Sequence, residues 1–352
     1  AALVLFAGGL EVPFKSFKQW FGPITVLSVV GVLLSSLIFA TALYATLTLL
    51  QIYSNDLLPS ILVLSAALAS TDPTAIIPTL KTMKFKRGWL RHVAVSVSGL
   101  TDVSGSVLTR FLLISLITVP FSQSNTFSTY LSPLLQKASY DALALQIMSG
   151  ILVGYFGYWL LKKFYRDIKH ENSDYAIADP ALLLSVPLFT FVLGNILGGA
   201  GFLASFVSGL LSEIEGGMRK ASHFYASFLD HLIKPFIFIS LGALVPIDTI
   251  LAFAPLGILS GLLFIFIIRP LVVFISLWPW LINNTFKVTD LLFLSTIRET
   301  GIIAAVLLVI SSSFSVIQSD FIIALGMWVI LLTLIIEPPL TPYISRKIGI
   351  VK

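Results

Sequence analysis

The chain has 352 residues, of which 57% are hydrophobic and only 11% are charged, and its formal net charge is +5. A water-soluble domain of this length needs far more polar surface, so the composition excludes the soluble classes and indicates a polytopic membrane protein. The apolar runs last about 18 to 28 residues, longer than the strands of a barrel, and predict an all-α bundle. The absence of cysteine excludes disulfides and thiolate chemistry.

The chain opens with AALVLFAGGLEV, an apolar run too short for a full span. We therefore expect the sequence to start inside a helix, with native N-terminal helices missing. Ten candidate spans follow, which makes about eleven in all, and the short sixth one is expected to be a re-entrant or tilted element. The spans are predicted at 24–50, 57–80, 92–119, 143–163, 178–197, 200–212, 228–248, 251–278, 288–312 and 317–337.

Basic residues orient these spans. If the loop at 11–22 is cytoplasmic, alternate loops lie inside; of the 22 Lys and Arg residues, four fall within spans and only Lys137 falls in an outside loop. This distribution follows the positive-inside rule, so we expect the basic loops to be cytoplasmic. We interpret the membrane as the plasma membrane of a prokaryote. Orientation thus explains the net charge without a nucleic-acid partner. The outside loop at 120–142 is predicted to contain a short surface helix.

Charged residues inside the spans are expensive, and each is a candidate functional residue. From the helical rise, Asp72, Asp102 and Arg298 lie at a similar depth, roughly 15 to 22 Å from a membrane face, on three different spans. Their convergence predicts an ion or proton site. The alternative, that they only neutralise one another and lock the bundle, is less favoured because buried ion pairs seldom improve stability over apolar residues. The remaining intramembrane charges are Arg110, Lys234, Arg269 and Glu299.

The stretch ASTDPTAIIPTL at 69–80 predicts a broken helix. Pro73 removes a backbone donor and pushes Asp72 away from helical dihedrals, so the chain should unwind around Ser70–Pro73. Unwound backbone at this depth frees carbonyls, and with the hydroxyls of Thr71 and Thr74 these can coordinate a cation.

A second break is predicted at IRETG, residues 297–301, seven spans later. This odd offset means opposite orientation, so 24–119 and 251–337 are expected to be inverted repeats, a pattern typical of secondary transporters.

Asp102 lies in VSGLTDVSGS, among small residues that let a neighbouring backbone approach closely. Because desolvation disfavours a charged carboxylate, such a residue can hold either a proton or a small cation. Competition between the two is sufficient for exchange. The plainer interpretation is a packing seam with one incidental acid.

At these motifs the chain resembles the NhaP-type sodium/proton antiporters of the cation/proton antiporter superfamily, along its whole length. ALVLFAGGLEV is similar to the family's ALILFEGGLEL, STDPTAI to TDPVAV, and VSGLTDVSG to ESLLND. FIIRPLVVF resembles the Arg-Pro helix, IRETGIIAA resembles LRGAIAL, and IIEPPLTPYISRKIGI resembles the closing segment.

The resemblance implies a role for each site residue. Asp102 would be the main cation- and proton-binding carboxylate, and Thr71, Asp72 and Ser98 would help to line the site. Na⁺ would lie at Asp102, Thr71 and Ser98, and Arg298 would neutralise the crossing of the broken helices.

Two positions depart from the family. Thr101 stands where the family has Asn and its electrogenic relatives have a second Asp, so we expect electroneutral one-to-one exchange. Val97 replaces a Glu whose usual partner is the Arg of the Arg-Pro helix, here Arg269. Arg269 is therefore expected to turn to Glu299, which completes the predicted charge-balancing set with Arg298.

By resemblance the protein would be a transporter and not an enzyme, would need no cofactor, and would form a homodimer in the bilayer. Residues 1–352 would be one transmembrane domain, in which the repeats carry the ion past a dimerising scaffold in an elevator-like movement. Na⁺ is the favoured ion, and Li⁺ and K⁺ stay open.

Three rival functions fit the sequence less well than cation/proton exchange does. A transporter of the same architecture for another solute, such as an organic anion symporter, would need a substrate-sized polar set that the sequence does not show. A channel fits broken helices with one titratable centre less well than alternating access does. An intramembrane aspartyl protease using Asp72 and Asp102 as its acid pair is a remote alternative.

Overall fold

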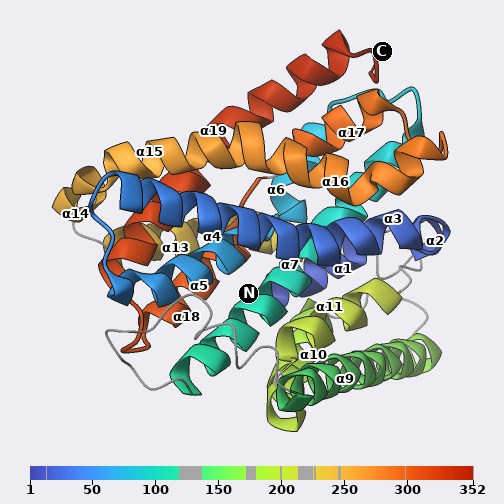
Figure 1. Ribbon diagram of the computed structural model, residues 1–352. Helices are drawn as coiled ribbons and strands as arrows, with labels where there is room; N and C mark the ends of the chain where they lie inside the picture. The colour runs from blue at the N-terminus through green and yellow to red at the C-terminus, as the bar shows by residue number, and fades with distance from the viewer. Residues whose placement is uncertain are drawn as a thin grey trace. The chain divides into compact units, whose positions relative to one another are not determined.

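The structure, a computed structural model, describes all residues except 13, 119–136, 172–179, 199, 213–224, 226, 245–246, 298 and 352 (Figure 1). Among the described residues the regular elements are helices, joined by one isolated bridge between Phe85 and Val351. In chain order they are α1 (Ala2–Glu11), α2 (Phe14–Gln19), α3 (Phe21–Thr25), η1 (Val26–Val30), α4 (Gly31–Leu49), η2 (Asn55–Leu57), α5 (Leu58–Leu68), α6 (Pro73–Lys81), α7 (Gly88–Thr118), α9 (Lys137–Glu171), α10 (Pro180–Leu197), α11 (Gly201–Leu211), η4 (Leu229–Ile233), α13 (Lys234–Leu244), α14 (Ile247–Ala252), α15 (Ala254–Leu263), η5 (Phe264–Ile268), α16 (Arg269–Ile282), α17 (Val288–Ser295), α18 (Ile302–Ser312) and α19 (Ser319–Lys347).

The all-α membrane architecture predicted from the sequence is confirmed. Five helical stretches among the described residues are long and apolar enough to cross a membrane: Phe21–Leu49, Gly88–Leu116, Tyr140–Phe164, Ala254–Ile282 and Ser319–Lys347. Shorter apolar helices account for the other predicted spans. The total of about eleven stays a prediction, because broken and short helices cannot be counted as spans by length alone.

Two helices extend furthest beyond their predicted bounds. The span predicted at 143–163 lies within α9, which extends to Lys137 and Glu171 because the polar residues at its ends are themselves good helix formers. The last predicted span ended at Glu337, whereas α19 continues through three prolines to Lys347. Prolines are tolerated in membrane helices where neighbouring groups satisfy the freed carbonyls. In the predicted outer loop, 119–136 lie outside the described residues.

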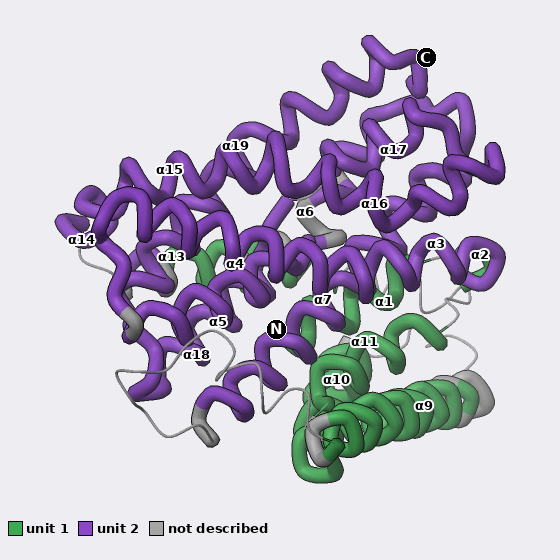
Figure 2. Tube along the Cα trace, viewed as in Figure 1, with its two compact units in different colours: residues 1–15, 137–239 green, residues 16–136, 240–352 purple. Residues whose placement is uncertain are grey.

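The chain divides into two compact units (Figure 2). The first contains residues 1–15 and 137–239, and the second contains 16–136 and 240–352. Both ranges predicted as core repeats, 24–119 and 251–337, belong to the second unit.

In the first unit, α11 packs against α1, α9 and α10. Gly9 of α1 lies directly against the backbone of Phe206, and Gly209 of α11 against the backbone of Phe6, so the two helices touch without intervening side chains. The short sixth element of the sequence is thus an 11-residue helix with a mostly buried surface.

The second unit contains the same series of elements twice. Each series begins with a long helix that includes a π-helical turn, α3–η1–α4 in the first and α15–η5–α16 in the second. Each continues with a helix broken near its middle, α5–α6 and α17–α18, and ends with a long helix, α7 and α19. This order supports the predicted repeats; their inversion stays a prediction.

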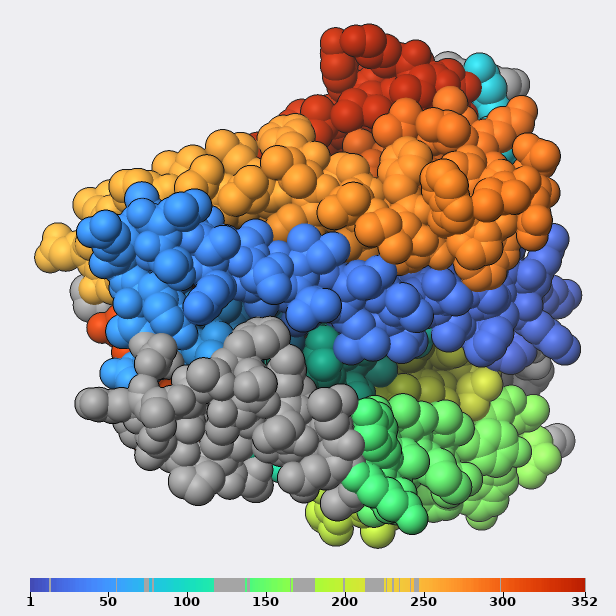
Figure 3. Space-filling model, in the orientation of Figure 1, coloured from blue at the N-terminus to red at the C-terminus, as the bar shows by residue number. Residues whose placement is uncertain are grey.

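Figure 3 shows the blue residues of α4 lying along the orange residues that follow α14, and α4 packs against η5 and α16. These helices expose large apolar side chains, among them Leu33, Leu37, Phe266, Leu271 and Ile275. Such a surface is typical of contact with lipid or with another subunit.

Candidate functional site

The first helix break separates α5 from α6. The hydroxyl of Ser70 turns back to donate a hydrogen bond to the carbonyl of Ala67, 3.1 Å away, and residues 70–72 lie outside both helices. α6 then begins at Pro73, a position where the missing backbone donor costs nothing. The predicted break at Ser70–Pro73 is confirmed.

The second helix break separates α17 from α18. α17 ends at Ser295, and α18 starts at Ile302 after Gly301, whose backbone is extended (φ −118°, ψ −150°). The predicted break at 297–301 is confirmed. Arg298, the predicted neutralising charge of the crossing, lies outside the described residues.

The two breaks cross at Asp72. Its backbone N–H donates to the carbonyl of Glu299 at 2.8 Å, and its Oδ2 accepts a hydrogen bond from the N–H of Ile302 at 3.4 Å. The carboxylate therefore caps the N-terminus of α18, which Gly301 cannot cap because it has no side chain. Asp72 fixes the geometry in which the four half-helices meet.

One face of α7 packs against the first break. The hydroxyl of Ser98 donates to the carbonyl of Thr71 at 3.0 Å, and Thr101, bonded to the carbonyl of Ser98 at 2.7 Å, also contacts the hydroxyl of Thr71. One turn further on, a Cβ placed at Gly105 would lie 2.9 Å from the Cβ of Ser70. Small and hydroxylated residues thus bring α7 up to the unwound chain.

Asp102 stands on this face of α7. Its side chain is buried, and its Oδ1 has no hydrogen-bond partner among the described residues. The side chain of Ser70 interacts with its carboxylate, and Asp72 lies within electrostatic reach. A buried carboxylate with an unsatisfied oxygen, beside the hydroxyls and carbonyls of an unwound segment, can bind a proton or a partly dehydrated cation. The structure brings together all five predicted binding residues, Thr71, Asp72, Ser98, Thr101 and Asp102.

Comparison with known proteins identifies the family. The chain matches the family described as sodium/hydrogen exchanger, transmembrane, over residues 1–347. It belongs to this exchanger family. This assignment confirms the resemblance seen in the motifs and makes the chain a transporter-family protein and not an enzyme.

Curated relatives of the exchanger chain are longer than it is. It is 26% identical to the K(+)/H(+) antiporter NhaP2 of Shewanella sp. (strain ANA-3), over 96% of the chain and 54% of that protein. It is 23% identical to a sodium, potassium, lithium and rubidium/H(+) antiporter of Bacillus pumilus (strain SAFR-032), over 98% of the chain and 53% of that protein. The chain thus spans about half the length of the curated relatives it matches.

The exchanger chain also shares its fold with a solved antiporter. The sodium proton antiporter MjNhaP1 from Methanocaldococcus jannaschii, determined at pH 8, superposes with a TM-score of 0.75 at 22% identity. The match covers 99% of this chain and 83% of that one. The predicted antiporter fold is confirmed.

Arg269 forms hydrogen bonds with the chain at the second break. It follows the π-helical turn η5, is buried, and donates through one terminal nitrogen to the carbonyls of Leu294 and Ile297 at 3.5 and 3.4 Å. Glu337 of α19 lies within electrostatic reach of its guanidinium. Glu299, the partner predicted for Arg269, supplies the backbone carbonyl that receives the Asp72 N–H, and its pairing with Arg269 stays a prediction.

Sequence reasoning missed three residues of α19 that face this break: Thr333, Glu337 and Thr341. All three are buried. Their spacing of four residues was the signal available, because it places them on one helix face. The span predicted at 317–337 ends within this set.

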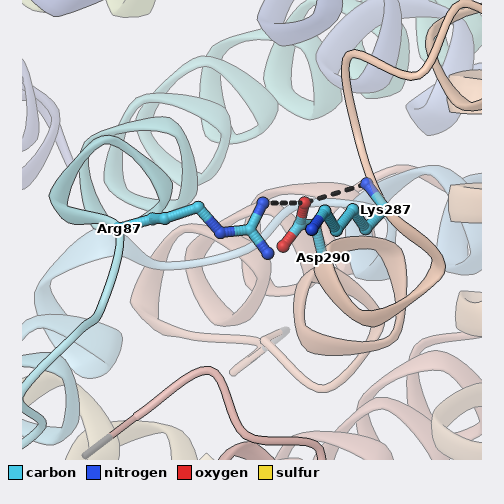
Figure 4. Close-up of polar contacts among 3 residues, drawn as sticks. All are labelled: Arg87, Lys287 and Asp290. Carbon is cyan, nitrogen blue, oxygen red and sulfur yellow. Dashed lines mark hydrogen bonds and ion pairs between the residues drawn. The ribbon is translucent and has the colours of Figure 1, made fainter.

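A further buried charge, Asp290, joins the two broken helices on one side (Figure 4). Its Oδ2 accepts hydrogen bonds from the guanidinium of Arg87 at 2.8 Å and from the backbone N–H of Lys287 at 2.9 Å. Arg87 lies between α6 and α7, and Asp290 lies in the first turn of α17. The pair therefore links a segment that follows the first break to one that precedes the second.

Proposed function

We propose that this chain is the transmembrane core of a secondary active antiporter that exchanges a monovalent cation for a proton at Asp102. The supporting observation is the Asp102 carboxylate itself, buried with one oxygen unpartnered, beside the polar atoms of the first break. Proton and cation would compete for this carboxylate, so that binding of one releases the other.

The cation would be held by Asp102 together with the oxygens of Thr71 and Ser98. Arg298 would neutralise the crossing of the broken helices, as the resemblance implies, and Arg269 and Glu299 would complete the charge-balancing set. Asp72 would act mainly by shaping the site, which agrees with the cap that it forms on α18. Membership of the exchanger family supports this assignment.

Exchange would be electroneutral, one cation for one proton. Thr101 occupies the position next to Asp102 where a second carboxylate would add another titrating charge. Its hydroxyl bonds to the Ser98 carbonyl and adds no charge to the site. The resemblance favours Na⁺, whereas the names of the curated relatives cover K⁺, Na⁺, Li⁺ and Rb⁺, so all four ions belong in the test.

Transport would proceed by an elevator-like movement in a homodimer in the plasma membrane, with the basic loops cytoplasmic. The division of the chain supports this proposal, because both broken helices belong to one compact unit and residues 137–239 belong to the other. The former would carry the ion, and the latter would contribute to the dimerising scaffold.

The deciding experiment is cation/proton exchange by the purified chain in proteoliposomes with a preset pH gradient, using Na⁺, Li⁺, K⁺ and Rb⁺ in turn. Asp102→Ala should abolish exchange, whereas Asp56→Ala, which removes an exposed acid, should leave it intact. Undiminished exchange by Asp102→Ala would refute the proposed site. A rate that changes with an imposed membrane potential would refute electroneutrality.

A further inference from the structure

The polar face of α19 is formed by Thr333, Glu337 and Thr341. The three side chains are 0%, 1% and 3% exposed, in a helix that is otherwise largely apolar. Residues four apart lie one above another on a helix, so these three form a single stripe. A buried acid within an apolar helix is costly and calls for a partner or a function.

Both threonines of the stripe contact the second break. Thr341 donates to the carbonyl of Thr296 at 2.7 Å, and the hydroxyl of Thr333 accepts the backbone N–H of Thr300 at 3.3 Å. These are backbone groups that the interrupted helix leaves without an intrahelical partner. The stripe therefore hydrogen-bonds the unwound segment near both of its ends. On α19, Glu337 lies midway between Thr333 and Thr341, the two residues that make these bonds.

Arg269 reaches the same segment from α16. Its guanidinium donates to Leu294 and Ile297, and its Nε has no hydrogen-bond partner among the described residues. Its hydrogen bonds are long, so they alone compensate poorly for burying a guanidinium. A carboxylate nearby offsets that cost, and Glu337 lies within electrostatic reach of Arg269.

We propose that Glu337 is a positioning residue of the ion site: as the counter-charge of Arg269, flanked by Thr333 and Thr341, it holds the second helix break in its binding geometry. Glu337 does not touch the ion. It acts through the segment whose Glu299 carbonyl receives the Asp72 N–H and whose Gly301 packs against the Asp72 carboxylate. A shift of that segment would displace Asp72, and with it Thr71, relative to Asp102.

The inference rests on the proposed function, so its test needs one measurement of transport and one that is independent of transport. For transport, Glu337→Gln should raise the KM for the cation about three- to thirtyfold, the range expected when a residue acts on a site through its neighbours, with a smaller effect on the maximal rate. Asp320→Asn, which removes an exposed acid from the same helix, should leave KM unchanged.

The independent measurement is a double-mutant cycle on thermal stability in detergent without added cation. Arg269→Gln and Glu337→Gln should each lower the melting temperature, because each removes one member of a pair of opposite buried charges. The loss of melting temperature in the double variant should be smaller than the sum of the losses in the two single variants. Additive losses, or an unchanged KM in Glu337→Gln, would overturn the inference. If the unaltered chain exchanges no cation, the proposed function fails, and the cycle still decides whether Glu337 and Arg269 are partners.

Discussion

Gly301 lies directly against the carboxylate of Asp72, so closely that no side chain fits between them. The contact joins the two helix breaks, since Asp72 ends the first and Gly301 ends the second. The glycine is required here for close approach and not for an unusual backbone conformation. A methyl group at this position would push Asp72 away from the N-terminus of α18.

Gly301→Ala should therefore lower both stability and transport. Overpacking of this kind costs about 1 to 3 kcal/mol, and it would also move Asp72 away from its hydrogen bond with Ile302. Thermal melting and the KM for the cation measure the two effects. Gly88→Ala is the matched control, because a Cβ at Gly88 meets nothing within 4 Å. Equal behaviour of the two variants would contradict the packing described here.

Asp72 and Asp102 should respond oppositely to neutralisation. Asp72→Asn weakens the charged cap of α18 and should lower stability by about 0.3 to 1 kcal/mol. Asp102→Asn removes a buried carboxylate with an unpartnered oxygen, so it should leave stability unchanged or raise it while abolishing exchange. Melting curves at mildly alkaline pH without added cation compare the two. Marked destabilisation by Asp102→Asn would mean that this residue serves the fold.

The ion pair between Arg87 and Asp290 should contribute to stability in proportion to the burial of Asp290. Arg87→Gln would leave a buried carboxylate with the Lys287 N–H as its remaining donor, at a cost of about 1 to 3 kcal/mol. Lys84→Gln removes an exposed charge from the same connecting segment and should have little effect. If the melting temperatures of the two variants coincide, the pair stabilises no more than a surface contact does.

The hydroxyl of Thr341 should matter more than its methyl group. Thr341→Val preserves shape but leaves the carbonyl of Thr296 without its donor, which should cost about 0.5 to 1.5 kcal/mol and raise the KM for the cation. Thr341→Ser retains the hydroxyl and should retain most of the affinity. An equal rise in KM for both variants would show that packing, and not the hydrogen bond, holds the break.

Much of the architecture was predictable because membrane helices satisfy their own backbone. Apolar length predicted the long helices, and Pro73 and the RETG stretch located both breaks, since each of these signals acts within one segment of chain. The candidate site on α7 was predictable from Asp102, an acid within an apolar run, and the resemblance added Ser98 and Thr101.

Contacts between segments were decided by the tertiary structure. The sequence by itself predicted Asp72 at a helix break and Asp102 on the next span, because composition locates the apolar spans and helical rise places each charge along them. It did not determine that Asp72 caps α18, or that Glu337 lies within electrostatic reach of Arg269. Those pairings depend on which helix faces are brought together, and distant segments share no local signal of a common neighbour. Only packing could show that α19, beyond the expected end of its span, holds the second break.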